Sequence, residues 1–381
     1  MRSLKILLQA AVVALVATSA GVSAAVPRYK VEMLITEREH PYALNQLFDL
    51  NNQGEVIGQD YDRLGSAGFV WSHGKFQGLE VEGYDFRPAR LNDRGQIAGS
   101  TVAGTFLYDH GRATKLNPTS DSIDGFGVSG LNNAGHVAGF NGSEENAEQY
   151  YYDGHTTRTM GIWQKLNIPP YYVEIYDLNN RDDVLGSYLD RDTNKRVQFT
   201  WRHGEMTLLP QFEGDEFGYV INDAGHVAGS LRSASNEYRP VVFRDGMAVD
   251  LLGSAPGQGQ AVGLNNQGWA VGSLFDAPSG PYTAFLYRDG RMYDLNDLLV
   301  DRDARRWSLS GAFRLNEAGQ MLVGGLARDN SRLRMQALLT PVPEPQTWLL
   351  MLAGMGLLAG MARVRCKPNP TPGARRCPLP A

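Results

Sequence analysis

The stretch LNNQGEVIG at residues 50–58 recurs six more times along the chain, and this repetition decides the fold. The other copies are LNDRGQIAG (91–99), LNNAGHVAG (131–139), LNNRDDVLG (178–186), INDAGHVAG (221–229), LNNQGWAVG (264–272) and LNEAGQMLVG (315–324). Successive first asparagines are separated by 41, 40, 47, 43, 43 and 51 residues. Self-similarity at such a period is typical of solenoids, propellers and other repeat arrays.

Each copy of this motif predicts a β-hairpin. An Asn in the first turn position and a Gly in the fourth favour a type I turn followed by a left-handed residue. Asp182 replaces that glycine once, and Asp tolerates the left-handed region better than most residues. A third apolar run, such as GFVW (68–71), and a Gly-ended tight turn, such as Ser72-His73-Gly74, follow each copy. Every unit therefore predicts four short strands.

Four strands per unit predict an all-β, seven-bladed β-propeller over residues 26–340. The seventh unit supplies only three strands, and its last strand lies at 336–340. Residues 29–35 (YKVEMLI) predict one further strand, which precedes the first unit and has no partner strand beside it in sequence. We therefore predict that this N-terminal strand completes antiparallel blade seven, which removes exposed sheet edges. An open β-solenoid is the competing interpretation, although four strands per repeat are too many for most solenoids.

The repeat units resemble the HAF repeat of bacterial extracellular proteins, which is named for a His-Ala-Phe at the start of the third strand. The resemblance covers about residues 42–340. It is clearest in the Asn-x-x-Gly-x-Val-x-Gly pattern, in Ala284-Phe285 and in DLNDLL at 294–299. Thr283 stands where the family has its His. The resemblance implies an extracellular repeat protein and carries no catalytic residue onto this chain.

Residues 1–24 predict a secretory signal peptide. Arg2 and Lys5 precede an apolar run that begins at Ile6, and small residues then lead to Val22-Ser23-Ala24. We expect cleavage after Ala24, with Ala25 as the second choice. The alternative is an uncleaved transmembrane helix, but the apolar run is short for one.

The other end of the chain has three parts in a specific order. A Pro-rich linker at 341–347 contains Val-Pro-Glu-Pro, an apolar segment follows at 348–362, and residues 363–381 form a basic tail. Fifteen helical residues span about 22 Å, which is short of a hydrocarbon core of about 30 Å. Snorkelling by Arg363 and local thinning of the bilayer could close this gap. The segment therefore predicts an inner-membrane anchor whose basic tail stays cytoplasmic, with the repeats outside.

This C-terminal arrangement resembles the PEP-CTERM sorting signal, in which Pro343, Glu344 and Pro345 match the recognition motif. The resemblance implies processing by an exosortase, a membrane protease-transpeptidase. It also implies a protein that is first membrane-anchored and then moves to the cell surface or the medium. This chain continues to Ala381, beyond the usual end of the family signal.

Charge and cysteine content exclude several classes of function. The segment 26–345 holds all 41 acidic residues and 29 of the 36 basic ones, a formal net charge of −12. Such a field repels polyanions, so we expect no nucleic-acid partner. The cysteines are Cys366 and Cys377, both beyond the repeats. The repeat domain therefore has no disulfide and no Cys-based metal site, and we expect no cofactor.

Variable connections between strands are the predicted binding surface. In a meander of strands A to D, the A–B and C–D turns share one rim, and the B–C and D–A connections share the other. The longer variable connections are 140–149, 161–175, 187–197 and 294–312. The aromatic residues placed there are Trp163, Tyr171, Tyr172, Tyr188 and Trp307. Such rings suit stacking on sugars or anchoring of a protein partner, but they could equally pack between blades.

Catalytic patterns are weak in this sequence. Asp190 with Asp192 and Asp301 with Asp303 are close carboxylate pairs, but they neighbour Arg or Lys and suit solvated loops. Repeat spacing scatters the histidines around the ring, which argues against a metal site. We therefore predict a non-catalytic binding protein for envelope polysaccharide or another protein. The alternatives are a carbohydrate-active enzyme, with carboxylates converging at the ring axis, and a purely structural surface protein.

Overall fold

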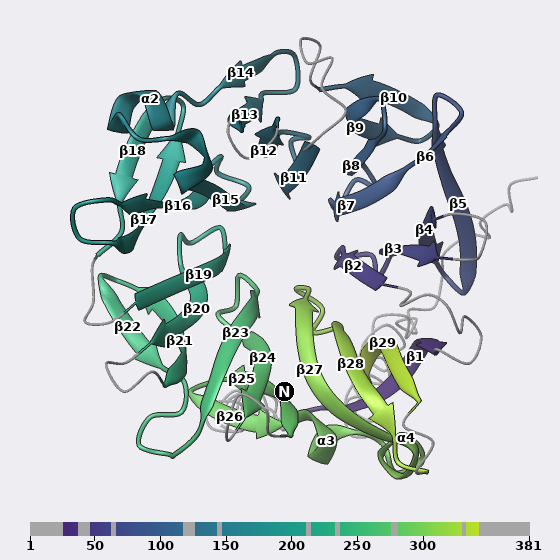
Figure 1. Ribbon diagram of the computed structural model, residues 1–381. Helices are drawn as coiled ribbons and strands as arrows, with labels where there is room; N and C mark the ends of the chain where they lie inside the picture. Colours follow the sequence, from purple (N-terminus) through teal and green to yellow (C-terminus); the bar gives the residue numbers. More distant parts are fainter. Residues whose placement is uncertain are drawn as a thin grey trace, which may run out of the picture. The chain divides into compact units, whose positions relative to one another are not determined.

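The strands of the computed structural model form seven separate sheets, which Figure 1 shows around a common axis. The structure describes residues 26–36, 46–61, 66–116, 126–142, 147–210, 215–232, 237–275, 281–329 and 333–342. All the sheets lie in the compact unit Tyr29–Pro341. The second unit, Met1–Arg28 with Val342–Ala381, consists almost entirely of residues outside the described ranges.

Each sheet is one blade, whose strands A to D run from the axis outward. Blade one is β2 (Gln46–Leu50), β3 (Val56–Tyr61), β4 (Ser66–Ser72) and β5 (Lys75–Val81), with the short β6 (Tyr84–Asp85) outside it. Blade two is β7 (Arg87–Leu91), β8 (Ile97–Thr101), β9 (Gly104–Asp109) and β10 (Arg112–Lys115). Blade three is β11 (Phe126–Leu131), β12 (Val137–Asn141), β13 (Glu148–Tyr152) and β14 (Thr157–Thr159). Blade four is β15 (Val173–Leu178), β16 (Val184–Asp190), β17 (Lys195–Arg202) and β18 (Glu205–Leu208).

The remaining blades follow the same order. Blade five is β19 (Asp215–Ile221), β20 (Val227–Arg232), β21 (Tyr238–Arg244) and β22 (Met247–Asp250). Blade six is β23 (Gln258–Leu264), β24 (Ala270–Phe275), β25 (Tyr282–Arg288) and β26 (Arg291–Asp294). Blade seven is β27 (Trp307–Leu315), β28 (Met321–Ala327), β29 (Arg334–Val342) and β1 (Arg28–Thr36). Short helices occupy two D–A connections: α2 (Ile162–Leu166) and the 3₁₀ turn η2 (Pro170–Tyr172), then α3 (Leu295–Leu298) and α4 (Asp301–Arg306).

The predicted seven-bladed propeller and its closure by the N-terminal strand are confirmed. In blade seven the strand order is β1-β29-β28-β27, so the outermost strand comes from the start of the chain. Two further contacts hold β1: Val300 N donates to the Tyr29 carbonyl at 2.8 Å, and Val31 N donates to Asp303 Oδ2 at 2.9 Å. The open solenoid is therefore wrong for this chain.

The turn chemistry follows the motif. The fourth turn position has a positive φ in every copy, for example 74° at Gly95 and 66° at Asp182. In the C–D turns, both central residues can be left-handed, as at His110 (48°) and Gly111 (91°), which is the primed hairpin geometry. Blade one departs from the prediction because Glu82 and Gly83 make one more such turn, which adds the two-residue strand β6.

Hydrophobic clusters lie between adjacent blades and hold the sheets together. One cluster joins blades one and seven and includes Ile35, Trp71 and Leu338. The glycine that ends the motif allows a different close contact, between two strands of one blade. A Cβ on Gly272 would lie 1.9 Å from the carbonyl oxygen of Gln260 on the neighbouring A strand. Only glycine lets these two backbones approach so closely.

Candidate functional site

The first asparagine of each motif links its own turn to the next blade. Asn92 Oδ1 accepts hydrogen bonds from the backbone N–H groups of Arg94 and Gln96, both at 3.0 Å. Its Nδ2 donates across the blade boundary to the Asn132 carbonyl at 2.9 Å. A buried carboxamide provides both the acceptor and the donor that this arrangement needs.

The same cross-blade hydrogen bond recurs around the entire ring. We call the seven residues the asparagine circuit: Asn51, Asn92, Asn132, Asn179, Asn222, Asn265 and Asn316. Their Nδ2-to-carbonyl distances run from 2.9 to 3.3 Å. The last bond runs from Asn316 to the Asn51 carbonyl at 2.9 Å, so the circuit is closed. Sequence reasoning assigned these residues only a local turn role.

A second circuit lies beside the first one and is built from the next residue of each motif. We call it the polar circuit: Asn52, Asp93, Asn133, Asn180, Asp223, Asn266 and Glu317. The backbone N–H of each member donates to the side-chain oxygen of the member in the next blade, at 2.7 to 2.9 Å. Sequence reasoning missed this circuit, although an Asn, Asp or Glu in every copy was a usable signal.

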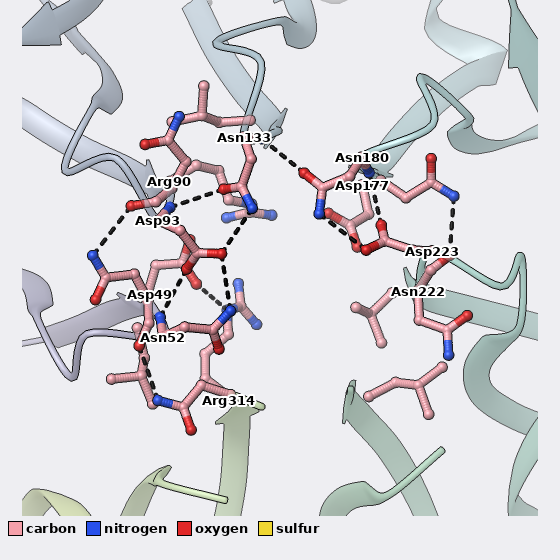
Figure 2. A pocket seen from close by; sticks show the side chains of 18 of the residues that line it. Asp49, Asn52, Arg90, Asp93, Asn133, Asp177, Asn180, Asn222, Asp223 and Arg314 are labelled. Atoms are coloured by element: carbon pink, nitrogen blue, oxygen red, sulfur yellow. Dashed lines mark hydrogen bonds and ion pairs between the residues drawn. The ribbon is translucent and has the colours of Figure 1, made fainter. Parts of the chain in front are cut away.

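The two circuits surround a cavity of about 210 Å³ at the ring axis. Its lining combines members of both circuits with the ends of the innermost strands, including Leu264 and Val220. Figure 2 shows the polar side chains that converge on this space from several blades. The cavity lies at the rim of the A–B turns, which we call the tight-turn rim. It is the rim opposite the variable connections that the sequence predicts to bind.

Four charged side chains form the inner lining, and each stands two residues before a motif asparagine. We call Arg314, Asp49, Arg90 and Asp177 the charged row; blades seven, one, two and four supply them. A β-bulge immediately precedes each position, as between Leu47 and Asp49, and between Pro88 and Arg90. A bulge changes the direction in which the side chains beside it point. In these strands the side chains of the charged row consequently line the cavity.

Hydrogen bonds and ion pairs hold the charged row in place. Arg314 Nε lies 3.1 Å from Asp49 Oδ1, and the other oxygen of Asp49 accepts from the Leu91 N–H at 2.9 Å. Arg90 donates to the Ala89 carbonyl at 3.0 Å and to the Tyr176 carbonyl at 3.4 Å. Figure 2 places Asp177 across the cavity from Asp49 and Arg314.

Burial shifts the protonation of two of these groups. It raises the pKa of Asp177 to about 6, although the charge of Arg90 and the Ile221 N–H favour the carboxylate. Burial also lowers the pKa of Arg90, and repulsion from Arg314 lowers it further. Asp177 therefore changes charge close to neutral pH.

Blades three, five and six leave the inner lining uncharged. Their corresponding residues are Gly130, Val220 and Gly263. A Cβ on Gly130 would lie 2.4 Å from Leu178 Cβ, so glycine lets blade four approach closely there. At this position, therefore, blades one, two, four and seven supply charged residues, and blades three, five and six supply small or apolar ones.

The predicted aromatic residues do not line this cavity. Trp163 and Tyr188 pack against the hydrophobic cluster of blades three and four, and both are partly buried. The Tyr171 side chain is 48 % exposed, and its ring contacts that of Tyr172 with centroids 4.6 Å apart. These four residues gather around blade four, where Tyr171 offers the accessible ring.

The prediction that Trp307 belongs to an aromatic binding surface needs correction. Its side chain is 1 % exposed, because it begins β27 and faces the interior of the domain. The Arg306 guanidinium lies 4.8 Å from its ring centroid. Trp307 therefore presents no stacking surface, and blade seven keeps it apart from the aromatic residues around blade four.

The carboxylate pairs have structural roles. Asp190 accepts hydrogen bonds from the N–H groups of Asp192 and Thr193 and so caps the β16–β17 turn. Asp303 is 4 % exposed and holds β1 through the Val31 N–H. Neither pair lines the axial cavity.

The histidines are less scattered than repeat spacing suggests. His136 Nδ1 lies 2.7 Å from Asp182 Oδ1, and His203 Nε2 lies 3.7 Å from the other oxygen of the same carboxylate. Asp182 therefore draws together histidines of blades three and four, which repeat spacing alone could not reveal. Among the described residues, no group of three or more His, Cys, Asp or Glu is arranged to hold a metal ion.

The comparisons with known proteins bear on sorting and on the fold. Residues 341–365 match the PEP-CTERM protein-sorting motif, which implies an exported protein that an exosortase sorts to the surface or the medium. No curated protein matches the chain. Within the described residues, no helix is both long and apolar enough to span a membrane. The predicted signal peptide and anchor lie outside those residues, and the HAF resemblance stays a prediction.

Solved structures share the propeller architecture at low sequence identity. The β-propeller domain of the Trilobed protease from Pyrococcus furiosus is 12 % identical with a TM-score of 0.55, over 80 % of this chain and 100 % of that one. The acylaminoacyl peptidase from Pyrococcus horikoshii is 13 % identical with a TM-score of 0.51, over 74 % of this chain and 50 % of that one. Such likeness defines the fold class alone.

Proposed function

We propose that this chain is an exported envelope or extracellular protein whose propeller binds a ligand without catalysis in the axial cavity. The observation that carries the proposal is the cavity itself, a polar space into which members of both circuits project. Three of its carboxylates, those of Asp93, Asp223 and Glu317, already accept backbone hydrogen bonds from the neighbouring blade. Groups held in this way give a preformed recognition surface.

Sorting by the C-terminal signal completes the proposal. Cleavage after Ala24 releases the leader, and residues 348–362 anchor the precursor in the inner membrane until an exosortase acts near Pro343–Pro345. Mass spectrometry of the protein recovered from cells tests both steps. We expect an N-terminus at Ala25 and loss of the tail. Glu344→Ala should leave the tail attached, and an unchanged product would refute exosortase processing.

Filling the cavity tests the binding site. Val220→Phe adds volume to the lining, and Val249→Phe makes the same change on the outermost strand of the same blade. Binding of the full-length chain to native exopolysaccharide and envelope extracts should fall at least tenfold only in the first variant, with thermal unfolding compared in both. Loss of binding in Tyr171→Ala but not in Val220→Phe would place the site on the variable rim instead.

A carbohydrate-active enzyme is the second candidate, and one observation favours it. The axial cavity contains Asp177, whose pKa is raised to about 6, together with the Asp49 carboxylate. A perturbed carboxyl in a cavity is typical of acid–base catalysis. Turnover on a glycoside panel that is lost in Asp177→Asn would support an enzyme. Binding without turnover supports our proposal.

A further inference from the structure

The charged row alternates donors and acceptors along the cavity lining. Arg314 and Asp49 are joined at 3.1 Å, and the charges of Asp49 and Asp177 both act on Arg90. Arg90 reaches past blade three, where the corresponding residue is Gly130, and its Nη2 meets the Tyr176 carbonyl of blade four at 3.4 Å. The result is a sequence of guanidinium, carboxylate, guanidinium and carboxylate (Figure 2).

This alternation matches one kind of ligand group. A guanidinium only donates hydrogen bonds, and an ionised carboxylate only accepts them. Each hydroxyl of a vicinal diol does both, so neighbouring hydroxyls can each accept from an arginine and donate to an aspartate. A simple anion would satisfy only the arginines, and a simple cation only the aspartates.

The rest of the lining suits the carbon skeleton of such a ligand. Val220 and Leu264 lie in blades five and six, where the charged row has no member. A sugar ring presents hydroxyls at its edge and C–H groups on its faces, which apolar side chains can cover. Five carboxyl groups line the cavity (Asp49, Asp93, Asp177, Asp223 and Glu317), against the two arginines of the row. This excess of acidic groups disfavours carboxylated or sulfated sugars.

Cavity size limits the ligand further. About 210 Å³ is below the range of about 300–1,000 Å³ that takes drug-sized molecules. The space therefore suits one sugar residue, not an internal stretch of a chain.

We propose that the axial cavity binds a single neutral sugar residue, whose vicinal hydroxyls lie along Arg314, Asp49, Arg90 and Asp177. This inference rests on the proposed binding function and names the ligand class of the same site. The ligand is a free neutral monosaccharide or the terminal residue of a neutral glycan.

Calorimetric titration of the full-length chain provides the test. The probes are neutral hexoses, the deoxy-hexoses that lack one hydroxyl of a vicinal pair, hexuronates, and sulfate. We expect binding of at least one neutral hexose and a loss of about 10- to 100-fold with its deoxy analogue, since hydrogen bonds to charged groups carry that much discrimination. Asp177→Asn should cause a similar loss, while Asp190→Asn, on the exposed β16–β17 turn, should bind normally.

Each other outcome has a defined meaning. Binding of hexuronates or sulfate but not neutral hexoses would overturn the ligand class while leaving the axial site in place. Neutral-hexose binding that survives both Asp177→Asn and Arg314→Gln would overturn the role of the charged row. If no probe binds, and the Val220→Phe variant still binds envelope extracts as the parent does, the axial site itself is refuted.

Discussion

Removal of one amide from the asparagine circuit should destabilise the whole ring. Asn51 makes four hydrogen bonds through its side chain: Nδ2 donates to Glu55 Oε2 at 2.8 Å and to the Asn92 carbonyl at 3.1 Å. Its Oδ1 accepts from the N–H groups of Gln53 at 3.1 Å and Glu55 at 2.9 Å. Each bond contributes about 1 kcal/mol net, so Asn51→Ala should cost about 4 kcal/mol.

Asn51→Asp separates the two roles of this side chain. The carboxylate can still accept both turn hydrogen bonds, but it loses both donors and faces the Asn92 carbonyl. We expect it to cost about 2 kcal/mol or more. Gln53→Ala, in the same turn but with an exposed side chain, is the matched control and should change stability by less than about 0.5 kcal/mol.

Urea unfolding of the three variants measures these differences from their midpoints, provided that the slopes agree. The closing hydrogen bond from Asn316 to the Asn51 carbonyl uses only the backbone of residue 51 and should survive each substitution. An Asn51→Ala variant within about 1 kcal/mol of the parent would refute the reasoning, since one buried and three partly buried hydrogen bonds would then contribute almost nothing.

Three further predictions concern other parts of the ring. Because the pKa of Asp177 is higher in the folded chain (about 6) than its ordinary 3.8, the folded state holds the proton more tightly, and the stability of the fold falls by about 2 kcal/mol as pH rises from 4 to 7. Unfolding of Asp177→Asn should lack this decline, and an equal decline would contradict the assignment. Asp303→Ala leaves the Val31 N–H without its partner, so limited proteolysis should remove β1 faster than in the parent, and equal cleavage rates would count against the clasp. Gly272→Ala forces a Cβ to within 1.9 Å of the Gln260 carbonyl and should lower the thermal midpoint by several degrees, whereas an unchanged midpoint would show that the backbone relaxes there.

The fold was predictable because its decisive information is local and repeated. The motif specifies a turn that each unit forms alone, and seven copies predict both the blade count and the strand count. Closure was predictable as well, because the three strands of the seventh unit and the one strand before the first unit leave a single way to complete a blade. The small strand β6 was missed, since Glu82 is an unusual residue for a left-handed position, and so were the short helices of two D–A connections.

The axial cavity was not predictable in the same way. The residues of the charged row share a position but not a type, since Asp49 and Arg90 correspond to Gly130 and Val220 in other blades. No repeated pattern therefore marks them. The side chains of the charged row come together because of the curvature of the ring and a bulge in each innermost strand. The spacing of the repeats predicts neither feature.

The burial of individual aromatic residues could not be predicted from the sequence either. Trp307 and Tyr171 both fall within the variable connections that the sequence predicts, yet one is 1 % and the other 48 % exposed. Trp307 begins a strand, whereas Tyr171 lies in the 3₁₀ turn η2. Sequence placed both residues on the same rim but could not distinguish a core position from a surface one.

Because the asparagine circuit is closed, the geometry of the ring does not depend on the order of the blades along the chain. Each link joins a blade only to its spatial neighbour, and the bond between Asn316 and Asn51 spans 265 residues of sequence yet matches the others. No blade is first or last in this arrangement. A circular permutant that joins the natural termini and opens in the β16–β17 loop would rebuild all seven links, because none of them depends on where translation begins.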